Sequence, residues 1–380
     1  MAGAARGQAQ FTVTDLGSLG GTFCEAWGIN DSGEVVGVAA DSGGNQHAFL
    51  YSNGTMQQLP FLYPGPSCAY GINDSGQVVG EANTPNPHTK GTVAFVYSGG
   101  TIQSLGLGGQ YSCGYGINNN GQIAGYGNDQ AFLYSGGTIQ NLGRLSGDSA
   151  SKAFGINDSG QVVGWATTSS GYTQAFLYSN GTMQNLGTLV GDQYSGANGI
   201  NDNGQVVGYS DASDLTQHAF LYSNGTMQNL GVGVQNSSAC GINDSGQVVG
   251  YYESGTSGDV AFLWQSGTGM QDLNNLIPSN SGWTLDEATG INASGQICGW
   301  GINPSGQNDA FLLTPTPEPS SLALLAASGI GLVVYGLRRR RKRMRLASLK
   351  VESTISNQDD ASALLPFPSG SSWTEATRAA

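Results

Sequence analysis

Short apolar runs alternate with glycine- and asparagine-rich turns along most of the chain, and this pattern repeats. One stretch, Gly-Ile-Asn-Asp-Ser-Gly-Gln-Val-Val-Gly, occurs in full at 71–80, 155–164 and 241–250. Four looser copies begin at Gly28, Gly116, Gly199 and Gly290. Self-similarity at a period of about 40–50 residues predicts a propeller or another repeat array, because each unit must bury its apolar face against its neighbours.

The sequence pattern of each unit predicts four short strands. Read from Ala175, they are Ala-Phe-Leu-Tyr, Thr-Met-Gln-Asn-Leu-Gly, Gly-Ala-Asn-Gly-Ile-Asn and Gln-Val-Val-Gly-Tyr-Ser. Asn180-Gly181 joins the first two strands and predicts a type I′ hairpin, whose central residues need positive φ. The glycine of Asn-Asp-Ser-Gly recurs in all seven copies, as a left-handed position closing a turn requires. The first asparagine of that turn also recurs, and its side chain can bond the backbone two residues on.

Three apolar columns recur once per unit and predict the core. They are a leucine column (Leu16, Leu59, Leu105, Leu142, Leu186, Leu230, Leu273), an isoleucine column (Ile29, Ile72, Ile117, Ile156, Ile200, Ile242, Ile291) and a phenylalanine column (Phe49, Phe95, Phe132, Phe176, Phe220, Phe262, Phe311). Small alanine beside each large phenylalanine is typical of sheets that interdigitate face to face.

The two ends of the array complement each other. The repeat starts at Phe11, in the second strand of a unit, and stops at 310–313, the first strand of one. Together they complete one unit, whereas an open array needs polar caps. We therefore predict, over residues 11–313, an all-β fold: a seven-bladed β-propeller of four-stranded antiparallel blades closed by the N- and C-terminal strands. A β-solenoid is the alternative.

Charge and cysteine usage exclude several classes of function. Before Pro315 there are four basic residues against 21 acidic ones, a net charge of about −17, so no basic footprint for nucleic acid exists there. The turn aspartate is missing from two of the seven copies, and one dispensable carboxylate per unit does not make a calcium loop. We expect no metal and no cofactor. Five cysteines spread over different units (Cys24, Cys68, Cys113, Cys240, Cys298) are read as small buried fillers.

The composition changes at both ends of the array. Residues 1–10 are read as a leader or the remnant of a signal region. Residues 314–321 form a linker with a Pro-Glu-Pro motif, residues 322–337 an uncharged run predicted as one transmembrane helix, and residues 338–345 a basic cluster that marks its cytoplasmic side. Residues 346–380 are expected to be a disordered polar tail. The basic residues are Arg338, Arg339, Arg340, Arg341, Lys342, Arg343 and Arg345.

Two resemblances to known families follow from these motifs. The Ala-Phe-Leu-Tyr-Ser-Asn-Gly and Gly-Ile-Asn units, with His-Ala-Phe at 47–49 and 218–220, resemble the HAF-family extracellular repeat, which implies an exported protein with no established reaction. Pro317, Glu318 and Pro319, followed by an apolar run and arginines, resemble a bacterial PEP-CTERM sorting signal. That resemblance implies an exosortase as a partner, a link to exopolysaccharide, and transient membrane anchoring at the cell surface or in the matrix. The chain departs from this pattern in continuing well past the arginines.

Three functional classes fit the sequence: a non-catalytic binding or adhesion module for polysaccharide or another surface partner, a polysaccharide-active enzyme, and a structural spacer. The first is favoured, since the acids that match no repeat position, such as Asp129, Glu253 and Glu287, are not paired by any motif. In an up-and-down meander both short turns share one face, so the variable connections share the other. Candidate ligand-binding residues on those connections are Tyr63, Tyr172, Tyr194, Asp192, Asp211, Asp214, Trp283 and Glu287.

Overall fold

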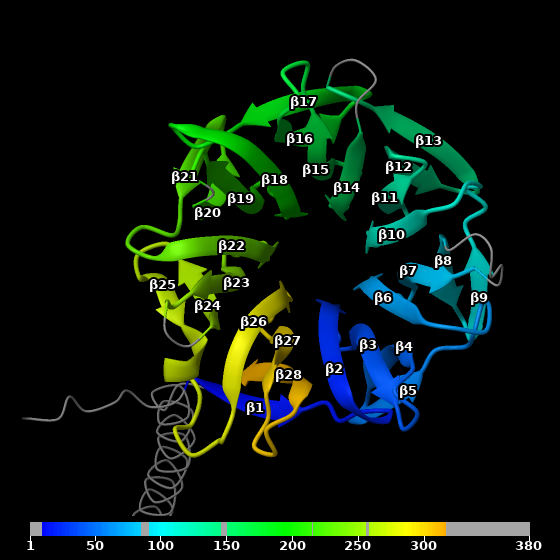
Figure 1. Cartoon of the computed structure of the whole chain (residues 1–380), viewed down its shortest axis with the longest axis vertical. Coiled ribbons are helices and arrows are strands. Elements are labelled where there is room, and N and C mark those ends of the chain that lie inside the picture. Colours follow the sequence, from blue (N-terminus) through cyan, green and yellow to red (C-terminus); the bar gives the residue numbers. More distant parts are fainter. Residues whose placement is uncertain (1–9, 85–90, 146–149, 215, 256–257, 317–380) are drawn as a thin grey trace, which may run out of the picture. The chain divides into compact units, whose positions relative to one another are not determined.

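A computed structural model describes residues 10–84, 91–145, 150–214, 216–255 and 258–316, and their regular structure is almost entirely β-strand. The sheets stand around a central opening (Figure 1). The strands nearest that opening are β2 (Gly20–Ile29), β6 (Ser67–Ile72), β10 (Ser112–Ile117), β14 (Ser151–Ile156), β18 (Asp192–Ile200), β22 (Gln235–Ile242) and β26 (Thr284–Ile291). Each ends in one copy of the Gly-Ile sequence, so the repeat defines the inner wall.

The remaining strands follow outwards in chain order. The second strands are β3 (Val35–Asp41), β7 (Val78–Asn83), β11 (Ile123–Gly127), β15 (Val162–Thr167), β19 (Val206–Ala212), β23 (Val248–Glu253) and β27 (Ile297–Ile302). The third are β4 (Gln46–Ser52), β8 (Thr92–Ser98), β12 (Gln130–Ser135), β16 (Thr173–Ser179), β20 (Gln217–Ser223), β24 (Asp259–Gln265) and β28 (Asn308–Pro315). The outermost are β5 (Thr55–Gln58), β9 (Thr101–Ser104), β13 (Thr138–Gly143), β17 (Thr182–Gly187), β21 (Thr226–Asn229), β25 (Gly269–Asp272) and β1 (Phe11–Asp15). One short 3-10 helix, η1 (Leu273–Asn275), follows β25.

The first strand closes the ring. Five sheets hold four consecutive antiparallel strands each, and an eight-stranded sheet joins β26-β27-β28 to β2-β3-β4-β5. The link between those two halves is a single parallel pair, Phe23 with Asn308. β1 pairs antiparallel with β28, so that Val13 lies opposite Leu313. The predicted closure by the two ends of the array is confirmed, and the chain does not run as an open solenoid.

The turn geometry agrees with the sequence. Asn180 and Gly181 have φ of 52° and 80°, as a type I′ hairpin requires. The glycine that ends each Asn-Asp-Ser-Gly turn has φ between 71° and 78° in all seven copies. Its amide donates to the carbonyl of the first asparagine, as in Gly160 to Asn157 at 2.9 Å. Both turns therefore depend on left-handed positions that glycine adopts without strain.

The core lies between neighbouring sheets, in seven separate apolar clusters. The predicted phenylalanine and leucine columns are buried throughout. The isoleucine column is confirmed as core only in part. Ile72, Ile200 and Ile291 are buried, whereas the other four are partly buried, and all members of the column line the axial channel as well as touching the core. They end the innermost strands, where the sheets converge on the axis, so one side of each isoleucine faces the opening.

Several predictions fall outside the described residues. These are the sorting motif, the segment 322–337, the basic cluster, the tail and nearly all of the leader. Among the residues that are described, no helix is long and apolar enough to span a bilayer.

Candidate functional site at the two ends of the axial channel

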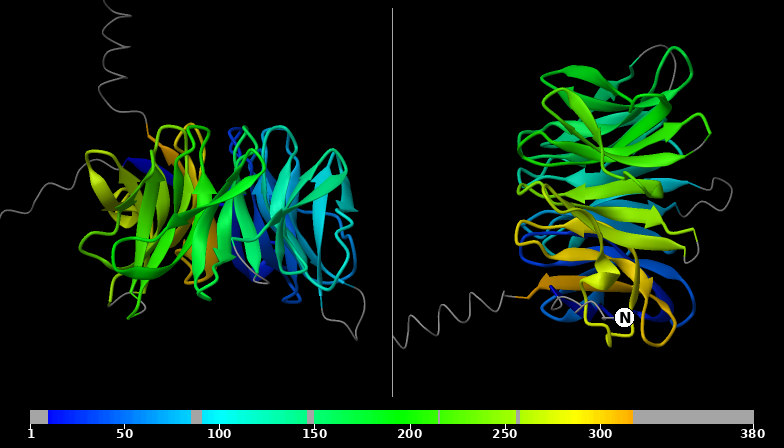
Figure 2. Two further views of the ribbon diagram at one scale, coloured as in Figure 1. Left: turned by 90° about the horizontal axis from the view of Figure 1, so that it is seen from above. Right: turned by 90° about the vertical axis from the view of Figure 1, so that its left-hand side faces the viewer.

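The consecutive strand order gives the molecule two unlike faces. Both short turns, Asn-Asp-Ser-Gly and Asn-Gly, lie at one end of the strands, and the longer connections lie at the other. Figure 2 shows the sheets edge-on, with connections at both ends. The expected division into a short-turn face and a variable-loop face is confirmed. The axial channel opens on each face, and its two mouths are built from different residues.

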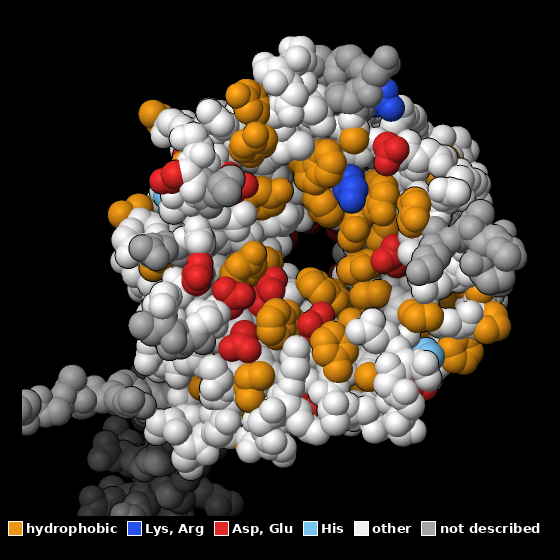
Figure 3. Space-filling model, in the orientation of Figure 1, with side chains coloured by type: hydrophobic (Ala, Val, Ile, Leu, Met, Phe, Trp, Pro, Cys, Tyr) orange, Lys and Arg blue, Asp and Glu red, His pale blue; other side chains and the backbone are white. Residues whose placement is uncertain are grey.

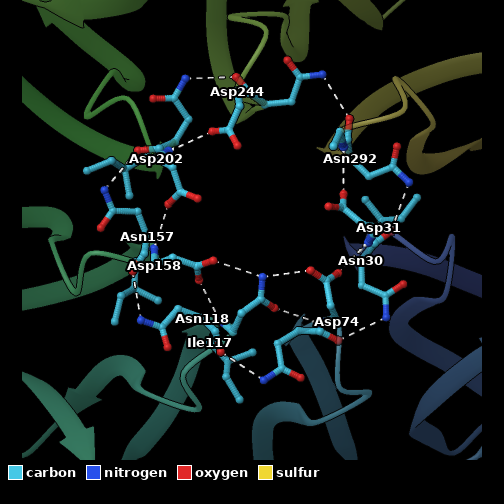
Figure 4. A pocket seen from close by; sticks show the side chains of 18 of the residues that line it. Asn30, Asp31, Asp74, Ile117, Asn118, Asn157, Asp158, Asp202, Asp244 and Asn292 are labelled. Atoms are coloured by element: carbon cyan, nitrogen blue, oxygen red, sulfur yellow. Dashed lines mark hydrogen bonds between the residues drawn. The ribbon is translucent and has the colours of Figure 1, made fainter.

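A closed ring of asparagines forms the mouth on the short-turn face, which we call the polar mouth (Figure 4). In each copy the Nδ2 of the turn asparagine donates to the main-chain carbonyl of the asparagine in the next unit. The bonds run Asn30 to Asn73 to Asn118 to Asn157 to Asn201 to Asn243 to Asn292 and back to Asn30, at 2.9–3.1 Å. The same asparagine also accepts from the amide four residues on, as at Gln161 to Asn157, 2.9 Å. The expected local bond is present in some copies, but the link between units was not foreseen.

A second ring of side chains lies beside the asparagines. Its members are Asp31, Asp74, Asn119, Asp158, Asp202, Asp244 and Ala293. Each carboxylate accepts the backbone amide of a neighbouring unit, for example Asp202 to the Oδ1 of Asp244 at 2.9 Å. Asn119 donates from its Nδ2 to Asp74 at 2.8 Å and to Asp158 at 3.1 Å, which relieves repulsion there. The cavity they line has a volume of about 190 Å³.

Aromatic side chains surround the opposite mouth, which we call the aromatic mouth. The residue before each Gly-Ile-Asn faces the channel, and in four adjacent strands it is Trp27, Tyr70, Tyr115 or Phe154. Their ring centroids lie 6.0, 4.9 and 5.0 Å apart in succession, forming one continuous arc. The cavity inside has a volume of about 490 Å³. Figure 3 shows apolar side chains gathered around the central opening, with acidic ones among them.

The residue after the glycine of each Val-Val-Gly copy, which reads Ile-Ala-Gly or Ile-Cys-Gly in two units, forms a second column on the next strand outwards, and most of its side chains are large. This column reads Val38, Glu81, Tyr126, Trp165, Tyr209, Tyr251 and Trp300. Tyr209 and Tyr251 line the main cavity. The Nζ of Lys152 lies 4.3 Å from the Tyr126 ring centroid and 5.9 Å from that of Trp165, a cation–π contact that occupies one side of the mouth.

Carboxylates also line the aromatic mouth. Glu287 lines the main cavity, where the Sγ of Cys240 donates to its Oε1 at 3.6 Å. Burial raises the pKa of Glu287 to about 7, with smaller contributions from Asp259 and Glu25. A second cavity of about 430 Å³ is lined by Glu25 and Glu81 and shares Trp27 and Tyr70 with the first. Burial also raises the pKa of Glu25.

The structure brings some of the predicted ligand residues together on the variable-loop face. Tyr172 and Tyr194 pack edge to face, with centroids 5.1 Å apart. Asp211 accepts from Gln217, which lines the main cavity, at 3.1 Å. Asp192 lies 3.7 Å from the Nδ1 of His218. These residues flank the aromatic mouth, and Glu287 lies inside it.

Other predicted residues do not join the site. Trp283 packs against Phe311 and an apolar cluster, so its side chain contributes to the core and not to a ligand site. Asp214 only accepts from Thr216, two residues on. Tyr63 lies half-buried in the connection between β5 and β6. The unmatched acids Asp129 and Glu253 belong to different sheets, Asp129 in the turn after β11 and Glu253 at the end of β23.

Loop boundaries also need correction. Asp192, Tyr194, Asp211 and Glu287 were expected in connections, but each lies in a strand. The inner strands of these units extend further towards the variable-loop face than their glycine and aspartate content suggests. The two aromatic columns were not predicted to bind a ligand, because they lie inside strands and not in the variable loops. Their signal is the variation at two positions inside strands that are otherwise nearly identical from copy to copy.

All five cysteines are free thiols. Cys24, Cys113 and Cys298 are buried, as predicted of fillers, whereas Cys68 and Cys240 are only partly buried and line the two cavities. Burial raises the pKa of Cys298 to about 12 and that of Cys240 well above its usual value, so these thiols stay protonated. Within the described part of the chain, no three histidine, cysteine, aspartate or glutamate side chains are grouped closely enough to hold a metal ion.

Two segments of the chain match known family models. Residues 315–341 match the PEP-CTERM protein-sorting motif. The chain carries a PEP-CTERM sorting signal. This signal implies export, sorting to the cell surface and processing by an exosortase. Residues 193–309 match a protein family of unknown function, DUF3466. No curated protein matches the sequence.

Solved structures with a similar backbone show the fold alone. A structure titled "YCF48 bound to D1 peptide" matches with a TM-score of 0.50 and 12% identity, covering 82% of this chain and 98% of that one. TolB from Acinetobacter baumannii has a TM-score of 0.42, 11% identity, and coverage of 74% and 80%. The six-bladed β-propeller lectin of Aleuria aurantia has a TM-score of 0.37, 11% identity, and coverage of 82% and 98%. The described part of the chain is thus all-β apart from η1, and its fold is similar to that of the first of these structures.

Proposed function

We propose that this PEP-CTERM protein is an exported, non-catalytic binding module that holds polysaccharide at the aromatic mouth of its axial channel. The observation that carries the proposal is the arc of Trp27, Tyr70, Tyr115 and Phe154 around a cavity of about 490 Å³. Aromatic faces stack on the apolar faces of sugar rings while nearby polar groups bind the hydroxyls. Polar partners are at hand in Asn198, Gln217 and Glu287.

Rigid placement supports recognition by this mouth. The aromatic residues lie on the innermost strands, next to buried alanines and valines, and not on loop tips. A site held by strands keeps its geometry without ordering a loop when the ligand arrives. The flanking pair Tyr172 and Tyr194, together with Asp192 and Asp211, extends the surface outwards on the same face. We include these residues, with Glu287, in the proposed ligand surface.

The proposal also covers the number of blades, the family of the repeats and the processing of the C-terminal segment. We count seven blades, taking the eight-stranded sheet as two blades joined by its single parallel pair, and assign the repeats to the HAF family. Residues 322–337 then anchor the protein in the membrane until an exosortase acts near 317–319, and the tail 346–380 is absent from the mature form. Replacing Glu318 and Pro319 by alanine should leave the protein uncleaved and membrane-bound. Equal release of mutant and parent would refute this route.

A glycan array probed with the full chain tests the binding function. We expect selective binding to polysaccharides, lost in the double variant Trp27→Ala/Tyr70→Ala and retained in the matched variant Tyr63→Ala/Trp283→Ala, whose aromatic residues lie away from the cavity. Circular dichroism melts establish that each variant is folded. Binding that survives the first variant and disappears in the second would place the ligand elsewhere and refute the proposal.

A polysaccharide-active enzyme is the second candidate, and one observation favours it. Glu287, whose pKa burial raises to about 7, lies in the aromatic cavity with Glu25 close enough to contribute to that shift. A carboxyl group with a raised pKa is the usual general acid of glycosidases. A degradation screen run beside the array separates the two functions. Release of oligosaccharides that Glu287→Gln abolishes would favour the enzyme.

A further inference from the structure

Positive and negative side chains are unevenly distributed around the aromatic mouth. Lys152 occupies the rings of Tyr126 and Trp165 on one side. Glu287 lines the main cavity, and Glu25 and Glu81 line the second cavity of about 430 Å³ beside it. Glu25 lies on β2 and Glu81 on β7, so two neighbouring sheets bring these two carboxylates to one cavity, while Glu287 on β26 is near enough to Glu25 to interact with it electrostatically. The field across the opening therefore favours a ligand with positive charge on the Glu25 side.

These carboxylates have no basic partner in the described residues. The ion pairs found there join aspartates to His47 and His218, and none involves Glu25, Glu81 or Glu287. Their hydrogen bonds come from weak or neutral donors: the Tyr70 hydroxyl donates to Glu81 at 3.2 Å, and the Cys240 thiol donates to Glu287 at 3.6 Å. Half-buried carboxylates without a cation carry an uncompensated desolvation cost. An ammonium group arriving with the ligand would remove that cost.

The cavity walls suit a sugar that carries such a group. Trp27 and Tyr70 line both cavities, so one ligand can contact their rings and reach the carboxylates of the smaller cavity. The Nε1 of Trp27 is buried and has no acceptor among the described residues, which leaves a donor for a sugar hydroxyl. Aromatic rings also attract ammonium groups through their faces. A bare metal ion does not suit the site, because no three ligating side chains are grouped to hold one within the described ranges.

We propose that the polysaccharide bound at the aromatic mouth contains amino sugars with free, protonated amines, and that Glu25 and Glu81 receive one ammonium group while Trp27 and Tyr70 contact the sugar ring. This inference rests on the proposed binding function and narrows its ligand to a cationic glycan. It also gives the acidic side of the mouth a role that a neutral glycan leaves unexplained.

Calorimetric titration of the full chain with two oligosaccharides tests the inference. The probes are a β-1,4-linked glucosamine tetramer and its fully N-acetylated counterpart, which share a backbone and differ in charge, used in mildly acidic buffer. We expect the free-amine tetramer to bind about tenfold tighter or more, because the acetylated one offers no ammonium to the carboxylates. Raising the salt concentration should weaken only the free-amine complex.

Isosteric variants assign the effect to residues. Glu25→Gln/Glu81→Gln should reduce affinity for the free-amine tetramer about tenfold. The control Asp202→Asn/Asp244→Asn removes the same charge at the polar mouth, where Asn119 already occupies the equivalent position, and should leave affinity nearly unchanged. Thermal melts confirm folding.

The possible outcomes distinguish the inference of a cationic ligand from the proposed polysaccharide-binding function on which it rests. Equal binding of both tetramers that depends on Trp27 and Tyr70 would overturn the cationic ligand and leave polysaccharide binding standing. A free-amine preference unaffected by Glu25→Gln/Glu81→Gln would also overturn it. Failure of both tetramers, together with a glycan array on which nothing binds, would overturn both proposals.

Discussion

The two mouths of the axial channel are built from the same strands, but the residues of one are the same in every unit and the residues of the other vary from unit to unit. At the polar mouth the asparagine is the same in every unit, and its amide links each unit to the next. At the aromatic mouth, only a few residues away on the same strands, the equivalent column reads Trp27, Tyr70, Tyr115, Phe154, Asn198, Cys240 and Thr289.

This difference distinguishes positions that join the units of the ring from positions that are free to contact a ligand. A ring of identical units closes only if each junction satisfies the same hydrogen bonds, so the position that makes the junction must repeat. A ligand without matching symmetry contacts the units unequally, so the positions that touch it have no reason to repeat. The variation within the strands therefore supports our proposal that the aromatic mouth binds the ligand, whereas the uniform hydrogen bonds of the polar mouth join the units of the ring.

Removing the closing strand should have the largest effect on both mouths. Deletion of Phe11–Asp15 takes away the partner of β28 and the buried side chain of Phe11. Because the last sheet then loses its outermost strand and only the Phe23–Asn308 pair and the inner hydrogen bonds still join the two ends of the array, we expect loss of the cooperative melt followed by circular dichroism. A deletion variant that melts cooperatively near the parent temperature would show that closure does not depend on β1.

Breaking one junction should affect stability and spare binding. Asn157→Ala removes donors to Asn201 and Gln161 and the acceptor for the Gln161 amide, all buried or half-buried. We expect a loss of about 2–4 kcal/mol in chemical denaturation. Asp158→Asn, one residue on and more exposed, should change stability little. A folded Asn157→Ala protein that has lost glycan binding would break the division between the two mouths.

At the aromatic mouth, a substitution should increase the stability of the protein instead of lowering it. Glu287 has a pKa of about 7 when folded, against 4.5 ordinarily, so the folded state holds the proton more tightly and loses stability as pH rises from 4.5 through 7. Glu287→Gln removes that loss. Above pH 7 the variant should be more stable by on the order of 2–3 kcal/mol, whereas near pH 4 the two proteins should melt alike. A destabilised variant at high pH would mean that the charged form is favourably bound.

The smallest effect is expected far from the axis. Gly181 has φ of 80°, and a Cβ added there would meet no atom within 4 Å. Gly181→Ala should therefore cost only the conformational penalty, about 1–2 kcal/mol, and leave glycan binding unchanged. The melt and the array provide the measurements. A marked loss of binding would assign the ligand to the short-turn face.

The sequence predicts the parts of this molecule that depend on local rules. Positive φ at Asn180 and Gly181, burial of the phenylalanine column and pairing of the two array ends all follow from short patterns. The hydrogen bond from Asn157 to Asn201 does not, since it joins residues 44 positions apart. The aromatic arc escapes for the same reason: Trp27, Tyr70 and Tyr115 become neighbours only when separate strands converge on one axis.

Hydroxyl-radical footprinting of the full chain, read by mass spectrometry with and without an array-selected polysaccharide, tests the central claim most directly. Ligand at the aromatic mouth should protect Trp27, Tyr70 and Tyr115 from oxidation while leaving the exposed loop residues Phe61 and Val190 as reactive as before. Protection confined to those loops, or to the peptides that carry Asp31 to Asp244 at the polar mouth, would contradict the account.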